Sequence, residues 1–162
     1  MRRGGRAVAR AAALVLAAWT VPGAAETLHS YALIHDDASL VVQNRRVHLA
    51  GVYVPRTQAS CIDRPADDCR TRAAAALEFR IQGFVRCEIL ARHRDGSREG
   101  QCHVGSSTFD PGVDLGAYLI ERGWALAGPD APYEYRAIED LARHQNAGIW
   151  GNARVWTPRG YR

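Results

Sequence analysis

Apolar, β-favouring residues gather in short runs along much of the chain, and polar turns separate the runs. An Asp95-Gly96 turn lies between two of them, and Asp-Gly is a strong hairpin signal. The pattern therefore predicts short strands, most of them linked as hairpins. The runs cover residues 28–34, 40–42, 47–54, 84–91, 101–104 and 124–127.

Three other segments carry apolar residues three and four positions apart, which predicts helices. They are residues 70–82, residues 111–122 and a segment from about Pro132 to Gly148. Gly83 and Gly123 follow the first two, where a left-handed residue can end a helix. Short strands with helices between and after them predict an α+β, mainly β fold, a five-stranded OB-fold barrel with about three helices. Residues 149–162 are expected to form an extended strap.

The first 25 residues have the pattern of a secretory signal peptide. Four arginines precede an apolar run at residues 11–19, and the segment ends in Gly23-Ala24-Ala25, a small-residue cleavage site. The run is shorter than the roughly 20 apolar residues that span a bilayer. We therefore expect residues 1–25 to be removed and residues 26–162 to fold as one domain, periplasmic or secreted and not held in a membrane.

The net charge of the chain depends on the expected signal peptide. The whole chain has 21 Lys and Arg, 17 Asp and Glu, a net charge of +4 and a pI of about 9.1. The four signal-peptide arginines account for the whole excess, so the mature chain is formally neutral. Global charge therefore gives no argument for a nucleic acid or an anionic membrane as the partner.

Four cysteines follow the signal, and in an exported chain an even number favours disulfides. Cys61 and Cys69 are too far apart for the C-x-x-C spacing of a zinc site. Four cysteines allow three pairings. The predicted hairpin brings Cys87 near Cys102, so we expect that pair, together with Cys61–Cys69 within the polar segment 57–68.

Five sequence blocks stand in a characteristic order: DDASL at 36–40, HLAGVYVPR at 48–56, DLGAYLIERGWALA at 114–127, YRAIEDLARHQNAGIWG at 135–151 and PRGYR at 158–162. Together they resemble the thermonuclease, or staphylococcal-nuclease-like, domain family over residues 28–162. The resemblance implies a five-stranded OB barrel with three helices. Active members of the family hydrolyse DNA and RNA phosphodiesters with one calcium ion.

The calcium ligands that the resemblance implies are missing here. The family's two metal-binding aspartates fall at Ala38 and Tyr53, and neither side chain offers a carboxylate to a hard cation. Asp36 remains at the first position of the turn, where the family's aspartate is structural or acts indirectly. We therefore expect no metal at this site and no cofactor.

The catalytic groups that the resemblance implies are also altered. The family's glutamate falls at Arg56, and its first arginine at His48, which lacks the guanidinium fork that grips phosphate. Its second arginine falls at Ser97, or at Arg98 if one residue is skipped. Removing such groups lowers the rate of hydrolysis by orders of magnitude. We therefore expect a pseudoenzyme, which keeps the fold of the family but does not hydrolyse phosphodiesters.

The favoured function is therefore a binding module, expected to be a monomer. Basic and aromatic residues cluster where the family seats a phosphate, and a nucleic acid, another anionic polymer or a protein is the expected partner. The alternative is a divergent nuclease that uses calcium with Arg98, Arg56 and a rearranged acid, Asp37 being the nearest. The candidate binding residues are Asp36, Arg45, Arg46, His48, Tyr53 and Arg56.

Overall fold

The structure is a computed structural model that describes residues 25–55 and 69–151. Residues 1–24 of the expected signal peptide lie outside the described residues. So do Arg56, Cys61 and residues 152–162 of the expected strap. Within the described parts no helix is both long enough and apolar enough to cross a membrane.

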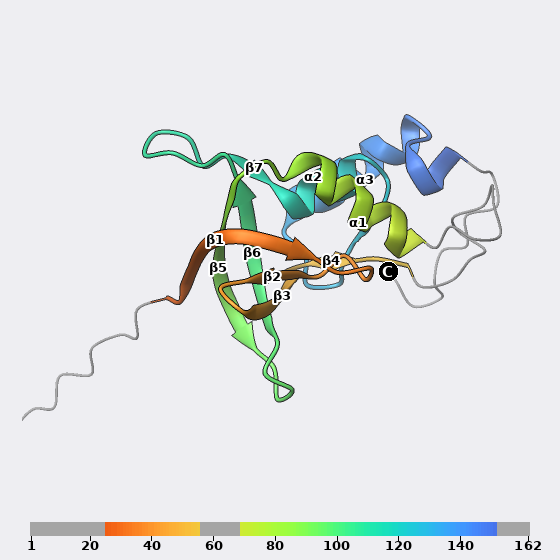
Figure 1. Cartoon of the computed structure of the whole chain (residues 1–162). Helices are drawn as coiled ribbons and strands as arrows, with labels where there is room; N and C mark the ends of the chain where they lie inside the picture. The colour runs from red at the N-terminus through yellow and green to blue at the C-terminus, as the bar shows by residue number, and fades with distance from the viewer. Residues whose placement is uncertain (1–24, 56–68, 152–162) are drawn as a thin grey trace, which may run out of the picture.

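Five strands close into a mixed β-barrel, which confirms the predicted OB-fold-like α+β class (Figure 1). The strands lie in the order β3-β2-β1-β5-β6. All neighbouring pairs are antiparallel except β3 and β6, whose parallel pairing closes the barrel. The barrel strands are β1 (Thr27–Ile34), β2 (Leu40–Val42), β3 (Arg45–Leu49), β5 (Phe84–Arg92) and β6 (Arg98–Val104).

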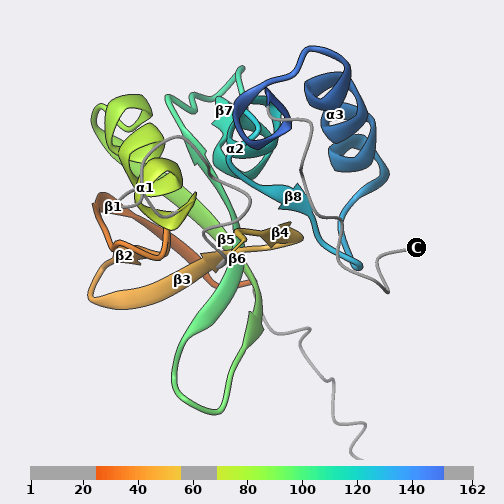
Figure 2. The ribbon, with the colours of Figure 1, turned by 90° about the vertical axis from the view of Figure 1, so that its right-hand side faces the viewer.

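The helices lie on one side of the barrel, and the β5–β6 hairpin extends away from them (Figure 2). Their apolar faces meet the inward residues of the strands in one core, which includes Leu40, Val47, Leu77 and Leu119. Burial of these side chains is the main source of stability for such a domain. The remaining elements are α1 (Cys69–Arg80), α2 (Leu115–Glu121), α3 (Tyr133–His144), β4 (Val52–Tyr53), β7 (Val113–Asp114), β8 (Leu126–Ala127) and the 3-10 helix η2 (Gly148–Gly151).

The predicted single strand at residues 47–54 is wrong, because the chain turns at Ala50–Gly51 and forms β3 and β4. Gly51 has a φ of +67°, and a Cβ there would lie 2.9 Å from Ala131 Cα. Its carbonyl accepts a hydrogen bond from the Gly128 amide at 2.7 Å. The break sends β4 to pair with β8 and leaves β3 in the barrel.

The predicted boundaries of the second and third helices also differ from the structure. Residues 111–114 are not helical, and α2 begins at Leu115 because Asp114, in extended conformation, is its N-cap. The third helix ends at His144, and Gly148 begins a separate 3-10 turn. Of the predicted strand at 124–127, only Leu126 and Ala127 pair with a neighbour.

Cys87 and Cys102 face each other across the β5–β6 hairpin and form a disulfide, which confirms that predicted pair. Cys69, at the start of α1, is also disulfide-bonded. Since Cys61 lies outside the described residues, the Cys61–Cys69 pair stays a prediction.

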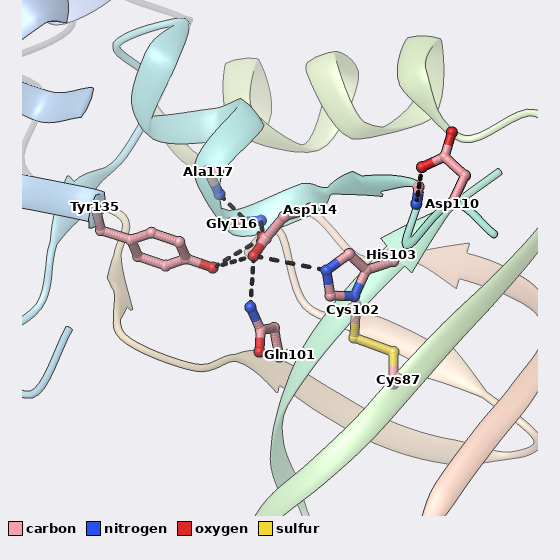
Figure 3. Close-up of polar contacts among 10 residues, drawn as sticks. Cys87, Gln101, Cys102, His103, Asp110, Asp114, Gly116, Ala117 and Tyr135 are labelled. Carbon is pink, nitrogen blue, oxygen red and sulfur yellow. Dashed lines mark hydrogen bonds and ion pairs between the residues drawn. A yellow bond between two sulfur atoms is a disulfide. The ribbon is translucent and has the colours of Figure 1, made fainter. Parts of the chain in front are cut away.

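Asp114 joins three elements of the fold (Figure 3). Its Oδ1 accepts hydrogen bonds from the amides of Gly116 and Ala117 in the first turn of α2. The Tyr135 hydroxyl of α3 donates to the same carboxylate at 2.8 Å, and Gln101 Nε2 of β6 donates to its Oδ2 at 2.8 Å. Burial, followed by the nearby Asp114 charge, raises the pKa of the Tyr135 phenol far above its ordinary value.

Candidate functional site

The turn between β1 and β2 forms one wall of the candidate site. The His35 amide donates to the Ser39 carbonyl and the Ala38 amide to the His35 carbonyl, while Ala38 has a φ of 61°. Asp37 Oδ1 accepts hydrogen bonds from the Ser39 amide at 3.1 Å and from its hydroxyl at 2.6 Å. The turn therefore uses one oxygen of Asp37 to hold its own shape.

The β5–β6 hairpin repeats this turn at a distance from the site. His93-Arg94-Asp95-Gly96-Ser97 has the same residues at three of its five positions, with arginine in place of Asp36 and glycine in place of Ala38 at the left-handed position. Asp95 Oδ1 accepts from the Ser97 amide at 3.0 Å and from its hydroxyl at 2.7 Å. Because Asp95 makes the same bonds to Ser97 in this second turn, a turn-forming role accounts for Asp37.

Strand β3 supplies a cation that reaches the turn. Arg46 Nε donates to Ser39 Oγ at 3.0 Å, and its Nη2 lies 3.5 Å from Asp37 Oδ2. His48, two residues along the strand, is half-buried. The second oxygen of Asp37 is thus already paired with a guanidinium.

Two hollows adjoin at this turn and share Asp37 and Arg70. The first, the Tyr53 hollow, encloses about 190 Å³, and the second, the His35 hollow, about 320 Å³. The Tyr53 hollow is lined by Asp37, Ala38, His48, Leu49, Val52, Tyr53, Val54 and Arg70. The His35 hollow is lined by His35, Asp36, Asp37, Arg46, Arg70 and Thr71.

The environment of Asp37 favours its charged form. Partial burial opposes ionisation, but the hydrogen bonds from Ser39 and the charges of Arg46 and His48 outweigh it and hold the pKa of Asp37 below its ordinary 3.8. A carboxyl with a depressed pKa in the folded state stabilises the fold above its unfolded-state pKa. That contribution is lost as the pH falls through the folded-state pKa.

Replacing Asp37 by asparagine should therefore lower the free energy of unfolding by about 1 kcal/mol at pH 7, because a charged, partly exposed hydrogen-bond acceptor is lost. The difference between the wild type and D37N should shrink below pH 4. Urea unfolding of both proteins at pH 7 and pH 3 measures it. A constant difference across this range would contradict the ionised role of Asp37.

The structure brings together most of the candidate binding residues, but not all of them. Asp36, Arg46, His48 and Tyr53 line one hollow or the other, whereas Arg45 lines neither and Arg56 lies outside the described residues.

Arg98, the candidate for a second catalytic arginine, lies elsewhere. It is buried, with Nε 3.2 Å from Glu26 Oε1 and Nη1 donating to the Gly96 carbonyl at 2.7 Å. Glu26 also pairs with Arg92 at 2.7 Å. Arg98 therefore serves the β5–β6 hairpin and the start of β1.

The described residues do not fit a calcium ion at this place. Calcium takes six to eight oxygen ligands. Among the described residues Asp37 contributes the one carboxylate of the Tyr53 hollow, and both its oxygens already have partners. In residues 25–55 and 69–151 no group of three His, Cys, Asp or Glu side chains is placed to hold a metal.

Sequence analysis missed Arg70 and Thr71, which line the His35 hollow from the first turn of α1. The signal for them was available in part, since α1 was predicted from residue 70. What the sequence lacked was the packing of that helix end beside the β1–β2 turn.

Comparison with known proteins gives one relative with substantial identity. No family model matches the chain. The succinoglycan biosynthesis protein ExoI of Rhizobium meliloti (strain 1021) is 31% identical over 154 residues, covering 90% of this chain and 78% of the relative. This level of identity and coverage shows that the chain belongs to the family of ExoI.

Proposed function

We propose that the chain is an extracytoplasmic, thermonuclease-like barrel that binds a polysaccharide at the Tyr53 hollow and does not hydrolyse phosphodiesters. The observation that carries the proposal is the state of Asp37: the carboxylate nearest to the expected catalytic site is held by Ser39 and Arg46. What the hollow offers a ligand is a tyrosine ring, a histidine and two charged groups of opposite sign.

These groups suit a sugar. Saccharides present hydroxyls, which both donate and accept hydrogen bonds, and C–H faces, which pack on aromatic rings. Arginine and histidine donate to such hydroxyls, and Tyr53 supplies the ring. Directional polar side chains beside an aromatic ring are the usual lining of a small polar-ligand site.

Charge favours a polysaccharide over a nucleic acid. A nucleic-acid site needs a basic stripe or patch. Here Arg46 is paired with Asp37, and Asp36 lies in the same hollow. Without residues 1–25 the chain has 17 arginines and 17 acidic residues, so it carries no net positive charge. The name of the relative ExoI, a succinoglycan biosynthesis protein, points to the same class of polymer.

The proposed location rests on a disulfide and on the relationship to ExoI. The Cys87–Cys102 disulfide and the relationship to ExoI are compatible with an extracytoplasmic protein, because disulfides persist in oxidising compartments. We propose that residues 1–25 are a cleaved signal peptide and that the domain is periplasmic or secreted.

The test is binding of purified succinoglycan by the chain without its first 25 residues, measured by affinity electrophoresis and calorimetry. We expect retardation by the polymer, and an affinity about tenfold lower in Tyr53→Thr and in His48→Gln, since a central aromatic or hydrogen-bonding group dominates such contacts. Tyr133→Ala is the matched control, because Tyr133 is an exposed tyrosine at the start of α3 and lines neither hollow.

Two results would contradict the proposal. One is a failure of the binding test: the wild type does not bind the polymer, or the Tyr53 and His48 variants bind it with the affinity of the wild type while circular dichroism shows that they are folded. The other is calcium-dependent cleavage of single-stranded DNA or RNA that follows the protein through purification and stops on chelation. That outcome would establish the divergent nuclease instead.

A further inference from the structure

The outer face of strands β1 and β5 carries an unusual set of exposed side chains. Along β1, the side chains at 29, 31 and 33 are exposed and those between them are at least partly buried. Tyr31 is 67% exposed, Leu33 73% and Phe84, on β5, 52%. Contiguous exposed apolar groups of this size mark a binding surface more often than single ones do.

We call the exposed side chains on this face of the two strands the β1–β5 stripe: His29, Tyr31, Leu33, Phe84 and Arg86. Tyr31 lies directly opposite Phe84, and His29 opposite Arg86, in the antiparallel register. The ring centroids of Tyr31 and Phe84 are 4.4 Å apart, and those of His29 and Phe84 are 5.4 Å apart. The strand pairing thus holds three rings side by side on a rigid surface.

The stripe leads to the candidate site. The alternation of exposed residues along β1 continues from Leu33 to His35, which is exposed and lines the His35 hollow. From His29 to His35 an extended chain spans about 20 Å. The stripe and the His35 hollow therefore follow one another along β1 and the residue after it, and the His35 hollow adjoins the Tyr53 hollow at Asp37 and Arg70.

The backbone argues against a peptide strand as the occupant. A peptide that adds to a sheet needs an unpaired edge. Residues 27–31 of β1 pair with β5 and residues 32–34 pair with β2, so each residue of the strand already has one strand partner. The stripe lies on the face of the sheet, where a ligand meets side chains and not the strand backbone.

The charges argue against a polyphosphate. Arg86 lies 3.1 Å from Glu88 on the same strand, so the cation of the stripe is already balanced. A neutral surface of aromatic rings edged by hydrogen-bonding groups suits sugar rings, whose C–H faces pack on aromatic faces and whose hydroxyls meet His29 and Arg86.

We propose that the β1–β5 stripe is a second part of the polysaccharide site, across which the polymer lies before it enters the hollows. This inference rests on the proposed function and names the form of its ligand: a chain several sugars long, in contact with the barrel from Phe84 to Tyr53.

The experiment compares Tyr31→Thr/Phe84→Thr with the wild type, using succinoglycan and size-fractionated oligosaccharides made from it by partial acid hydrolysis. Threonine removes the rings and retains strand propensity. The matched control is Leu90→Thr, since Leu90 is an exposed apolar residue of the same strand, six positions from Phe84. Calorimetry gives the affinity of each protein for each size fraction.

We expect the affinity of the wild type and of Leu90→Thr to rise with oligosaccharide length. In Tyr31→Thr/Phe84→Thr most of this rise should be absent, and the intact polymer should bind about tenfold more weakly. The thermal midpoint of the variant should stay near that of the wild type, because both side chains are exposed.

The outcomes separate the two proposals. If the polymer binds, and Tyr53→Thr weakens it while the stripe variant does not, the stripe is no part of the site and the proposed function stands. If the wild type binds no fraction, both proposals are wrong. If the stripe variant abolishes a concentration-dependent dimer without changing polymer affinity, the stripe is a contact between two copies and the inference is overturned.

Discussion

Replacing Asp114 by alanine should lower the free energy of unfolding by about 3 kcal/mol and the thermal midpoint by about 10 °C. The loss of an N-cap costs about 1 kcal/mol by itself. The larger part comes from Tyr135 and Gln101, which both donate to the carboxylate and would be left without this partner (Figure 3). Leaving a buried donor unsatisfied costs about 1–3 kcal/mol.

Two variants separate these contributions. Tyr135→Phe removes one donor and leaves the cap, so about 1 kcal/mol should be lost. Asp114→Asn keeps an oxygen for the helix amides and should fall between the wild type and alanine. Chemical denaturation of the three variants measures each step. An Asp114→Ala protein no less stable than Tyr135→Phe would show that the carboxylate does not join the three elements.

The same contacts show why the second helix was predicted four residues too early. Helical spacing of apolar residues continues back to Pro111, but Asp114 gives its side chain to the amides of Gly116 and Ala117 and is itself extended. Proline favours the first helical position, which made the early start plausible. The hydrogen-bonding partners of an aspartate depend on the fold, so periodicity alone does not locate the cap.

Sequence analysis identified most residues of the candidate site but not how they are arranged. The positions of His48 and Tyr53 followed from the resemblance, and both line the same hollow. Sequence analysis put Asp36 among the candidate binding residues and named Asp37 only for the alternative nuclease, whereas Asp37, and not Asp36, lines the Tyr53 hollow, beside the left-handed Ala38. Such a choice depends on one turn conformation, which the residue order does not specify.

The stripe escaped sequence analysis for a related reason. Tyr31 and Phe84 are ordinary residues of two strands 53 positions apart, and an aromatic residue in a strand is expected to be buried as readily as exposed. Their adjacency depends on the register of β1 against β5. Only the burial of the alternate residues, with Leu28 and Val85 inside, tells which face is outside.

Replacing Gly123 by alanine should also cost about 3 kcal/mol, for two reasons that add. Gly123 has a φ of +69°, a conformation that alanine adopts at a cost of about 1–2 kcal/mol. A Cβ would also lie 2.2 Å from the Ala147 carbonyl oxygen. The obstacle is backbone held by the Ile149 amide, which donates to the Gly123 carbonyl at 3.0 Å, so it cannot simply move aside.

The chain provides a matched control for this prediction. Gly105 has nearly the same φ, +71°, and a Cβ there would meet nothing within 4 Å. Gly105→Ala should therefore show the conformational cost alone, about 1 kcal/mol, when both variants are unfolded in urea. Equal destabilisation of the two variants would mean that the contact with Ala147 does not contribute to the loss of unfolding free energy.

The Gly123 substitution should also affect polymer binding at the Tyr53 hollow. Gly123 directly precedes the segment that leads to β8, and Leu126 of β8 lies opposite Tyr53 of β4. A backbone shift at Gly123 would pass through Trp124 and Ala125 to β8, the strand that pairs with Tyr53. Under the proposed function, Gly123→Ala should therefore weaken polymer binding even under conditions where the protein stays folded, while Gly105→Ala should not. Comparing the polymer affinities of the two variants tests whether the backbone contact at Gly123 affects binding at the Tyr53 hollow.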